Sequence, residues 1–582
     1  MSVQSSYLTM RDGVRIAIDL YLPDEVGEGE KLPTILHQTR YFRRMDLRWP
    51  AGLLVPADGY AALGTRKGFV TRGYAWVSVD VRGTGASYGH RVGPYPTEQV
   101  EDAAEIVDWI TRQPWSNGKV GALGISYDAG AAELLLANKH PAVNAIAPQF
   151  MLFDTYTDIV CPGGIPLTWF LKNWGSAVDS LDRNAVGDLG GWMTKLLLRG
   201  VRPVDADRDR SMLAAAVRDH VRNWNVYEMA LTLTYRDDAL PYQWPVTIDS
   251  FSPHAHKQDI ESSRAAIYSY SGWLDGAYAH AAIKRFLTLS NPGSRLIIGP
   301  WDHAGRHNIS PSVRSIARFD HTAELLRFFD YHLKGVDTGI ADEEPVRYYT
   351  MIEDRWKHAA SWPPPQTSMA TYYLRQDNSL STDKPDAANG YDTYRVDYSA
   401  GSGRLTRWES LLDELPDATR YPDRAEQDNK LLTYTSQPLE RDTEVTGHPV
   451  MTLYASSTAT DGNFFVYLED VAEDGNVTYV TEGGLRAIHR TLSEREPPYR
   501  QITPYRTFER QDAMPLVPGE TAELVFDLMP TSYLFKQGHS IRVALGGADK
   551  DHFAVPAGAP PSLRFHRDRI HASHIDVPTV PR

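Results

Sequence analysis

One stretch, residues 119–130 (Lys-Val-Gly-Ala-Leu-Gly-Ile-Ser-Tyr-Asp-Ala-Gly), constrains the fold more than any other part of the chain. Its apolar run Val120–Leu123 predicts a buried strand, and residues 131–137 predict a helix. Ser126 lies on the turn between them. A serine held between a strand and a helix is typical of a nucleophile elbow, which exposes the serine Oγ at the top of a sheet. From this motif alone, Ser126 could also be an ordinary loop serine.

The segments before this stretch predict an α/β sheet. Residues 6–22 alternate between apolar and polar side chains after the turn at Asp12-Gly13, which indicates an antiparallel hairpin. Apolar runs at 32–37 and 75–80 predict strands, and the spacing of apolar residues over 98–112 predicts a helix. Apolar strands that alternate with amphipathic helices indicate a mostly parallel sheet covered on both faces.

The periodicity changes twice farther along the chain. Helical patterns dominate residues 151–252, for example at 192–198 and 211–221, and the strand–helix alternation then resumes. After the proline-rich linker at 361–365, short β-type runs alternate with Gly, Pro and Asp turns, which favours a β-sandwich or jelly roll. Five such runs are residues 370–374, 450–454, 463–468, 522–526 and 540–545. We therefore predict an α/β domain in two parts, residues 1–150 and 253–360. A helical insertion, residues 151–252, separates the two parts, and a β-sandwich or jelly roll, residues 361–582, follows them.

Composition excludes several classes of function. The formal net charge of −14 argues against nucleic acid as a partner, and no apolar run is long enough for a membrane span. Cys161 is the single cysteine, so neither an intramolecular disulfide nor a cysteine-based metal site is possible. His254 and His256 lack a third ligand at a suggestive spacing. We expect a cytoplasmic protein without metal or cofactor, and a homodimer is possible.

A serine nucleophile needs a histidine base and a carboxylate that orients the histidine. In α/β-hydrolases the acid and then the histidine follow the serine, each on a loop after a later strand. Asp275 and His303 follow the apolar runs at 266–271 and 294–299 in this order. Two alternatives stay open at this point, because Asp275 could cap the next helix and Asp302 could serve as the acid.

Five motifs together resemble the cocaine-esterase-like (CocE/NonD) hydrolases, which are related to the X-Pro dipeptidyl-peptidase family. They span most of the predicted hydrolase domain: Asp80–Ser87, Gln113–Gly121, Gly124–Tyr127, Gly272–Asp275 and Gly299–His303. The resemblance implies an α/β-hydrolase domain, a helical cap after the elbow and a C-terminal jelly roll, in the order predicted above.

The resemblance also assigns roles to individual residues. It implies that Ser126 is the nucleophile, Asp275 the acid and His303 the base. It further implies that the Tyr41 hydroxyl and the Tyr127 backbone N–H stabilise the oxyanion. These donors fit the general rule that the residue after the nucleophile supplies one N–H and an early strand loop supplies the second donor.

Four positions near the elbow remain ambiguous. The family pattern Gly-x-Ser-Tyr-x-Gly has Ala129 at its last place here, preceded by Asp128. Asp128 could cap the elbow helix or attract a cationic substrate. Asp154 and Asp158 could bind a substrate amine or face solvent.

The resulting prediction is a serine hydrolase that cleaves small carboxylic esters through an acyl-enzyme intermediate. Within the resemblance, an amidase, an acylase or an aminopeptidase is the alternative. A carbohydrate-binding protein with a vestigial hydrolase domain is an alternative of another class, because jelly rolls also bind sugars.

Overall fold

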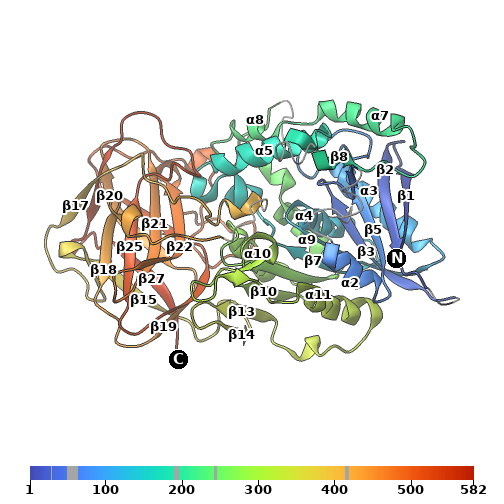
Figure 1. The fold of residues 1–582 in the computed structure, drawn as a ribbon. Helices are drawn as coiled ribbons and strands as arrows, with labels where there is room; N and C mark the ends of the chain where they lie inside the picture. Colours follow the sequence, from blue (N-terminus) through green and yellow to red (C-terminus); the bar gives the residue numbers. More distant parts are fainter. Residues whose placement is uncertain (26, 28, 49–62, 189–195, 242–245, 413–418) are drawn as a thin grey trace.

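The computed structural model describes the whole chain except residues 26, 28, 49–62, 189–195, 242–245 and 413–418. Two large sheets lie beside each other in the fold, one formed by the N-terminal part of the chain and one by the C-terminal part (Figure 1). No helix in the described ranges combines the length and the apolar character that a membrane crossing requires.

The first sheet is ten-stranded, with the order β1-β2-β5-β3-β6-β7-β9-β10-β13-β14. Neighbouring strands from β5 to β13 run parallel, whereas the strands at both edges run antiparallel. The predicted hairpin at 6–22 is confirmed as part of β1 and β2. The strands are β1 Ser2–Thr9, β2 Arg15–Leu22, β3 Leu32–Thr39, β5 Ala75–Asp80, β6 Ser116–Ile125, β7 Val143–Gln149, β9 Ala266–Gly272, β10 Arg295–Gly299, β13 Val346–Thr350 and β14 Arg355–Ala359.

Helices cover both faces of this sheet. Leu36 and Ala122 pack in one buried cluster with α3 (Thr97–Thr111), and their neighbours Ile35 and Leu123 pack in the opposite cluster. The opposite cluster includes side chains of α2 (Leu63–Val70) and α11 (His321–Phe329). Because successive strand residues point to opposite faces, this alternation buries both sides of the sheet, as predicted for a parallel α/β layer. Two further helices are α4 Tyr127–Leu134 and α10 Tyr278–Thr288.

The segment between β7 and β9 is mainly helical. Among its described residues, the α-helices are α5 Thr168–Asp182, α7 Ser211–Asp219, α8 Val226–Ala230 and α9 Lys257–Ser263, and shorter 3-10 and π helices lie in the same segment. The helix predicted at 192–198 lies partly outside the described residues, and its end is wrong. Leu198 begins the short strand β8 (Leu198–Val201), which pairs with β4 (Met45–Leu47). Cross-strand hydrogen bonding there overrides the helical spacing of the leucines.

The C-terminal sheet has thirteen strands, and its pairs are antiparallel except β16 with β18 among the described residues. All five β-type runs named from the sequence between 370 and 545 lie in its strands. These strands are β15 Ser368–Leu374, β16 Ser379–Ser381, β17 Tyr391–Arg395, β18 Leu432–Ser436, β19 Thr443–Gly447, β20 Val450–Ser457, β21 Asn463–Val471, β22 Val477–Arg486, β23 Ala522–Asp527, β24 Thr531–Phe535, β25 Ser540–Gly546, β26 Ser562–His566 and β27 His574–Val580.

Candidate active site

Four parallel strands of the first sheet, β3, β6, β9 and β10, end at the same edge of the sheet. Catalytic groups of open α/β sheets gather at the carboxyl ends of the strands. The loops that follow these four strands carry, in order, Tyr41, Ser126, Asp275 and His303.

Ser126 occupies a strained turn between β6 and α4. Its φ of 59° and ψ of −128° lie in a region that non-glycine residues rarely adopt. Its N–H donates to the carbonyl of Gln149 at 3.0 Å, and its own carbonyl accepts the N–H of Ala129 at 3.0 Å. A Cβ at Gly124 would lie 2.4 Å from the carbonyl carbon of Asp128, so the close approach of strand and helix requires glycine there. This is the geometry of a nucleophile elbow.

His303 and Asp275 form a buried, hydrogen-bonded pair. His303 Nδ1 donates to Asp275 Oδ1 at 2.7 Å, and the Ser271 hydroxyl donates to Asp275 Oδ2 at 3.2 Å. Burial raises the pKa of Asp275, and the hydrogen bond from His303 opposes that rise. The N–H of Tyr278 reaches the backbone carbonyl of Asp275, and the carboxylate itself makes no cap on α10. The carboxylate is therefore available to orient the His303 ring.

Asp302, the alternative acid, lies against a different histidine. Its Oδ2 pairs with His307 Nδ1 at 2.9 Å. The same oxygen accepts the N–H of Thr419 at 3.2 Å, from the segment between β17 and β18 of the C-terminal sheet. Adjacent residues in the chain thus point their side chains to separate partners, and the geometry favours Asp275 as the partner of His303.

The Tyr41 hydroxyl lies between the elbow and the helical insertion. It accepts the indole N–H of Trp174 at 3.0 Å, and the neighbouring Ser126 side chain acts to lower its pKa. Burial raises the pKa of Tyr41 to about 12, although nearby Arg40 opposes the rise. A phenol with this pKa keeps its proton at neutral pH, so its O–H can donate to a developing oxyanion.

Tyr127 is held in place by its own side chain. Its hydroxyl donates to Gln99 Oε1 at 2.7 Å and accepts an N–H of Arg91 at 2.9 Å. Its ring stacks on Tyr95 with the centroids 4.5 Å apart. Tyr127 is the first residue of α4, and the first N–H groups of a helix have no intrahelical acceptor. Its backbone N–H therefore meets the requirement for a second oxyanion donor.

An apolar cavity of about 90 Å³ opens beside Ser126 and Tyr127. Most of its wall comes from the helical insertion, and no described residue that lines it carries a charged side chain. Apolar side chains of the wall include Phe170, Leu171, Trp174, Trp224, Met229 and Phe251.

Asp128 is neither a helix cap nor part of the cavity wall. Its carboxylate pairs with His37 Nε2 at 3.0 Å, beneath β3. Burial raises the pKa of Asp128, and contacts with His37, the Thr39 hydroxyl and the Arg40 N–H lower it. Asp128 therefore makes no cap hydrogen bond to α4, because its buried carboxylate pairs with His37 instead. Ala129 is fully buried, and α4 continues through it without a break.

Asp154 and Asp158 are buried and already paired. Asp154 Oδ2 accepts the Tyr499 hydroxyl at 2.6 Å and pairs with Arg236 at 2.8 Å. Asp158 pairs with Lys284 and accepts two backbone N–H groups at 2.8 Å. Neither residue lines the cavity beside Ser126. Both carboxylates are therefore already paired with cationic side chains of the chain itself.

Sequence reasoning missed Arg407, a fully buried residue from beyond the proline-rich linker. Its guanidinium donates to the carbonyls of Trp273 at 2.7 Å and Gly276 at 2.8 Å, on either side of Asp275. The N–H of Gly276 in turn donates to the carbonyl of Arg407 at 2.9 Å. The C-terminal part of the chain therefore braces the loop that carries Asp275. No local pattern around Arg407 signals such a contact.

Comparison with known families covers most of the chain. The sequence model of the X-Pro dipeptidyl-peptidase (S15 family) matches residues 12–305. The model of the X-Pro dipeptidyl-peptidase C-terminal non-catalytic domain matches residues 338–574.

Individual relatives match over nearly the full chain. A protein of Mycobacterium bovis, named provisionally as a serine esterase, is 54% identical and covers 100% of this chain and 96% of its own. The cocaine esterase of a Rhodococcus species is 27% identical, with coverage of 100% and 99%. The crystal structure of a CocE/NonD family hydrolase from Staphylococcus aureus superposes with a TM-score of 0.71 at 19% identity, covering 99% of this chain and 93% of its own.

The structural likeness gives the fold, an α/β hydrolase followed by a sheet-rich C-terminal part. The resemblance drawn from the five sequence motifs is confirmed. The chain belongs to the X-Pro dipeptidyl-peptidase (S15) family.

Proposed function

We propose that this protein is a serine hydrolase that cleaves carboxylic esters of small molecules through an acyl-enzyme intermediate. The observation that carries the proposal is the convergence of a strained Ser126, the His303–Asp275 pair and the Tyr41 hydroxyl at the ends of four parallel strands. The names of the mycobacterial and Rhodococcus relatives, a serine esterase and a cocaine esterase, support the same chemistry.

Each group has a defined role in the proposed reaction. The Ser126 Oγ attacks the ester carbonyl while His303 Nε2 accepts its proton. Asp275 holds the His303 ring through Nδ1 and stabilises the imidazolium. The Tyr41 hydroxyl and the Tyr127 N–H donate to the oxyanion of the tetrahedral intermediate. His303 then protonates the leaving alcohol, and water releases the acid in a second, equivalent cycle.

We infer that the substrate places an uncharged, apolar group in the cavity beside Ser126. The wall offers apolar and aromatic side chains and no charged group among the described residues. An ammonium group would lose its hydration there without gaining a carboxylate partner, which is costly in an apolar site. The pairing of Asp154 with Arg236, and of Asp158 with Lys284, supports the same inference.

An amide or peptide substrate is the second candidate, because more distant relatives of this chain are named Xaa-Pro dipeptidyl-peptidases. A free N-terminal ammonium group is the feature that distinguishes a dipeptidyl-peptidase substrate from a simple ester. A comparison of p-nitrophenyl butyrate, an alanyl ester and an alanyl-prolyl anilide therefore separates the two candidates. We expect kcat/KM to be highest for the butyrate, whereas preference for the anilide would overturn the ester proposal.

The nucleophile is tested in the same preparation. Ser126→Ala should abolish turnover of p-nitrophenyl butyrate, and a fluorophosphonate probe should label wild type and leave the variant unlabelled. Full turnover by Ser126→Ala would refute the mechanism. Glycan binding without probe labelling of the wild type would instead favour the carbohydrate-binding alternative.

We also propose that residues 361–582 form a jelly roll and that residues 151–252 form a cap over the active site. The largely antiparallel pairing of the C-terminal sheet supports the first assignment. The contribution of α5 and α8 side chains to the cavity wall supports the second.

A further inference from the structure

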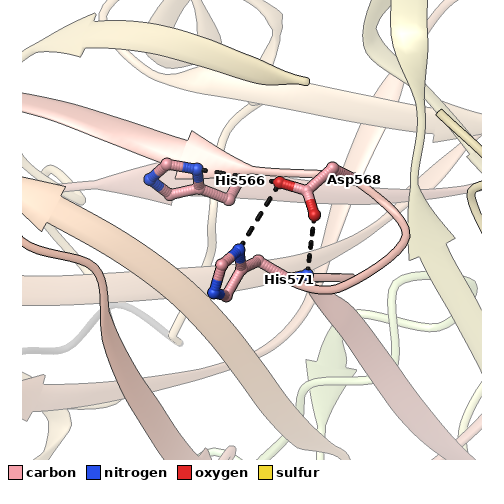
Figure 2. A group of neighbouring side chains, drawn as sticks. All are labelled: His566, Asp568 and His571. Carbon is pink, nitrogen blue, oxygen red and sulfur yellow. Dashed lines mark hydrogen bonds and ion pairs between the residues drawn. The ribbon is translucent and has the colours of Figure 1, made fainter. Parts of the chain in front are cut away.

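Three side chains at one end of the C-terminal sheet converge on a common point (Figure 2). His566 is the last residue of β26, and Asp568 and His571 lie in the loop that leads to β27. One ligand atom from each of the three lies within 4.8 Å of the other two. None of the three lines the cavity beside Ser126.

The distances in this cluster are longer than hydrogen bonds. Asp568 Oδ2 lies 4.0 Å from His566 Nδ1 and 3.6 Å from His571 Nδ1. Direct hydrogen bonds between such groups are about 2.7–3.2 Å long. Two ligand atoms on one tetrahedral zinc ion, each about 2.1 Å from the metal, lie about 3.4 Å apart. The observed spacing thus leaves room for an ion between the imidazoles and the carboxylate.

The surrounding hydrogen bonds hold Asp568 and His566 in place and leave Asp568 Oδ2 and His566 Nδ1 available to a metal ion. Asp568 is only 6% exposed, and its Oδ1 accepts the N–H groups of Ile570 and His571, both at 2.9 Å. The Oδ2 atom therefore remains directed at the two rings. His566 Nε2 lies 3.2 Å from the Thr521 hydroxyl, to which its N–H can donate. Such a hydrogen bond leaves Nδ1 unprotonated, as is usual for metal-bound histidines.

We propose that His566, Asp568 and His571 bind one zinc ion through His566 Nδ1, Asp568 Oδ2 and His571 Nδ1. Two imidazole nitrogens and one carboxylate oxygen form a ligand set that binds zinc in preference to magnesium or calcium. Water completes the coordination, since His571 is 38% exposed. The ion ties the loop before β27 to the end of β26, so its effect is on the stability of the C-terminal part of the chain.

Two substitutions remove a ligand with little change in shape. Asp568→Asn keeps an oxygen that can accept the Ile570 and His571 N–H groups but loses the anionic Oδ2. His571→Gln removes the imidazole of the loop. His574→Gln is the matched control, because His574 lies on the same segment and its Nδ1 already bonds to the carbonyl of Ala572 at 2.8 Å.

The test is titration of full-length, EDTA-stripped protein with zinc chloride by calorimetry, with bound metal counted by mass spectrometry. Wild type and His574→Gln should bind one equivalent, and zinc should raise their melting temperatures. Loss of a residue that hydrogen-bonds to a metal ligand weakens metal binding by about 10–100-fold. Asp568→Asn and His571→Gln each remove a ligand itself, so we expect them to weaken zinc binding by more than this. The proposal fails if wild type takes up no zinc, or if Asp568→Asn and His571→Gln bind it as tightly as wild type.

Discussion

Replacement of Arg407 by methionine tests whether the C-terminal part of the chain controls the catalytic acid. Two hydrogen bonds, to the carbonyls of Trp273 and Gly276, would be lost, and both carbonyls would stay buried. A hydrogen bond to a charged group contributes about 1.5–3 kcal/mol, so the loop would lose about 3–6 kcal/mol of support. Asp275, between the two carbonyls, would then no longer hold His303 in one orientation.

The expected kinetic effect has an upper and a lower bound. Complete loss of the orienting carboxylate costs about 10⁴-fold in kcat, and a displacement of about 1 Å costs about 10²-fold. We therefore expect Arg407→Met to lower kcat by at least about 10²-fold and by less than about 10⁴-fold. The KM should change little, because Arg407 does not line the cavity beside Ser126. The assay is steady-state hydrolysis of p-nitrophenyl butyrate.

A matched control separates positioning from general instability. Arg424 is a second buried arginine of the C-terminal part, and it pairs with Glu469 at 2.9 Å, away from the acid loop. Arg424→Met should destabilise the protein. Its kcat should equal that of wild type when the assay is run below the unfolding temperature of the variant. Arg407→Lys, which keeps the charge but can reach fewer carbonyls, should give an intermediate kcat. A folded Arg407→Met protein with wild-type kcat would refute the reasoning.

Four further outcomes are expected. Asp275→Asn should lower kcat by about 10⁴-fold, whereas Asp302→Asn should leave it nearly unchanged; the reverse result would make Asp302 the acid. Tyr41→Phe should lower kcat by about 10²–10³-fold without blocking fluorophosphonate labelling. The pKa of Tyr41 is raised to about 12, so its hydroxyl keeps its proton between about pH 8 and 10. A profile of kcat against pH should therefore show no decrease caused by ionisation of Tyr41 in this range. Arg285→Met leaves Glu133, whose partner it is at 2.9 Å, buried and unpaired, and urea unfolding should show a loss of about 3–5 kcal/mol.

Much of the fold could be predicted from local patterns. The hairpin at 6–22 and the five C-terminal β-type runs appear as strands, because apolar periodicity reflects which side of an element is buried. The helix predicted to end at Leu198 was wrong where β8 pairs with β4. Its sequence carries the helical spacing, and only the presence of a partner strand decides between the two structures.

The side-chain environments near the elbow could not be predicted in the same way. Asp128 was interpreted as a cap or a substrate contact, and it pairs with His37. Asp154 and Asp158 could be exposed or could bind an amine, and they pair with Arg236 and Lys284. These partners lie far away in the sequence, and a carboxylate shows no local sign of which buried cation it will meet.

The sequence by itself determined the order of Ser126, Asp275 and His303 and their places after three strands. That information suffices for a site because parallel strands bring their carboxyl ends to one edge. Only the tertiary structure decided how the site is held: the 2.7 Å contact of His303 with Asp275, the uncharged cavity wall and the bracing by Arg407. Each depends on the packing of segments distant in the chain, and the contacts of a buried polar group follow from that packing rather than from its neighbours in sequence.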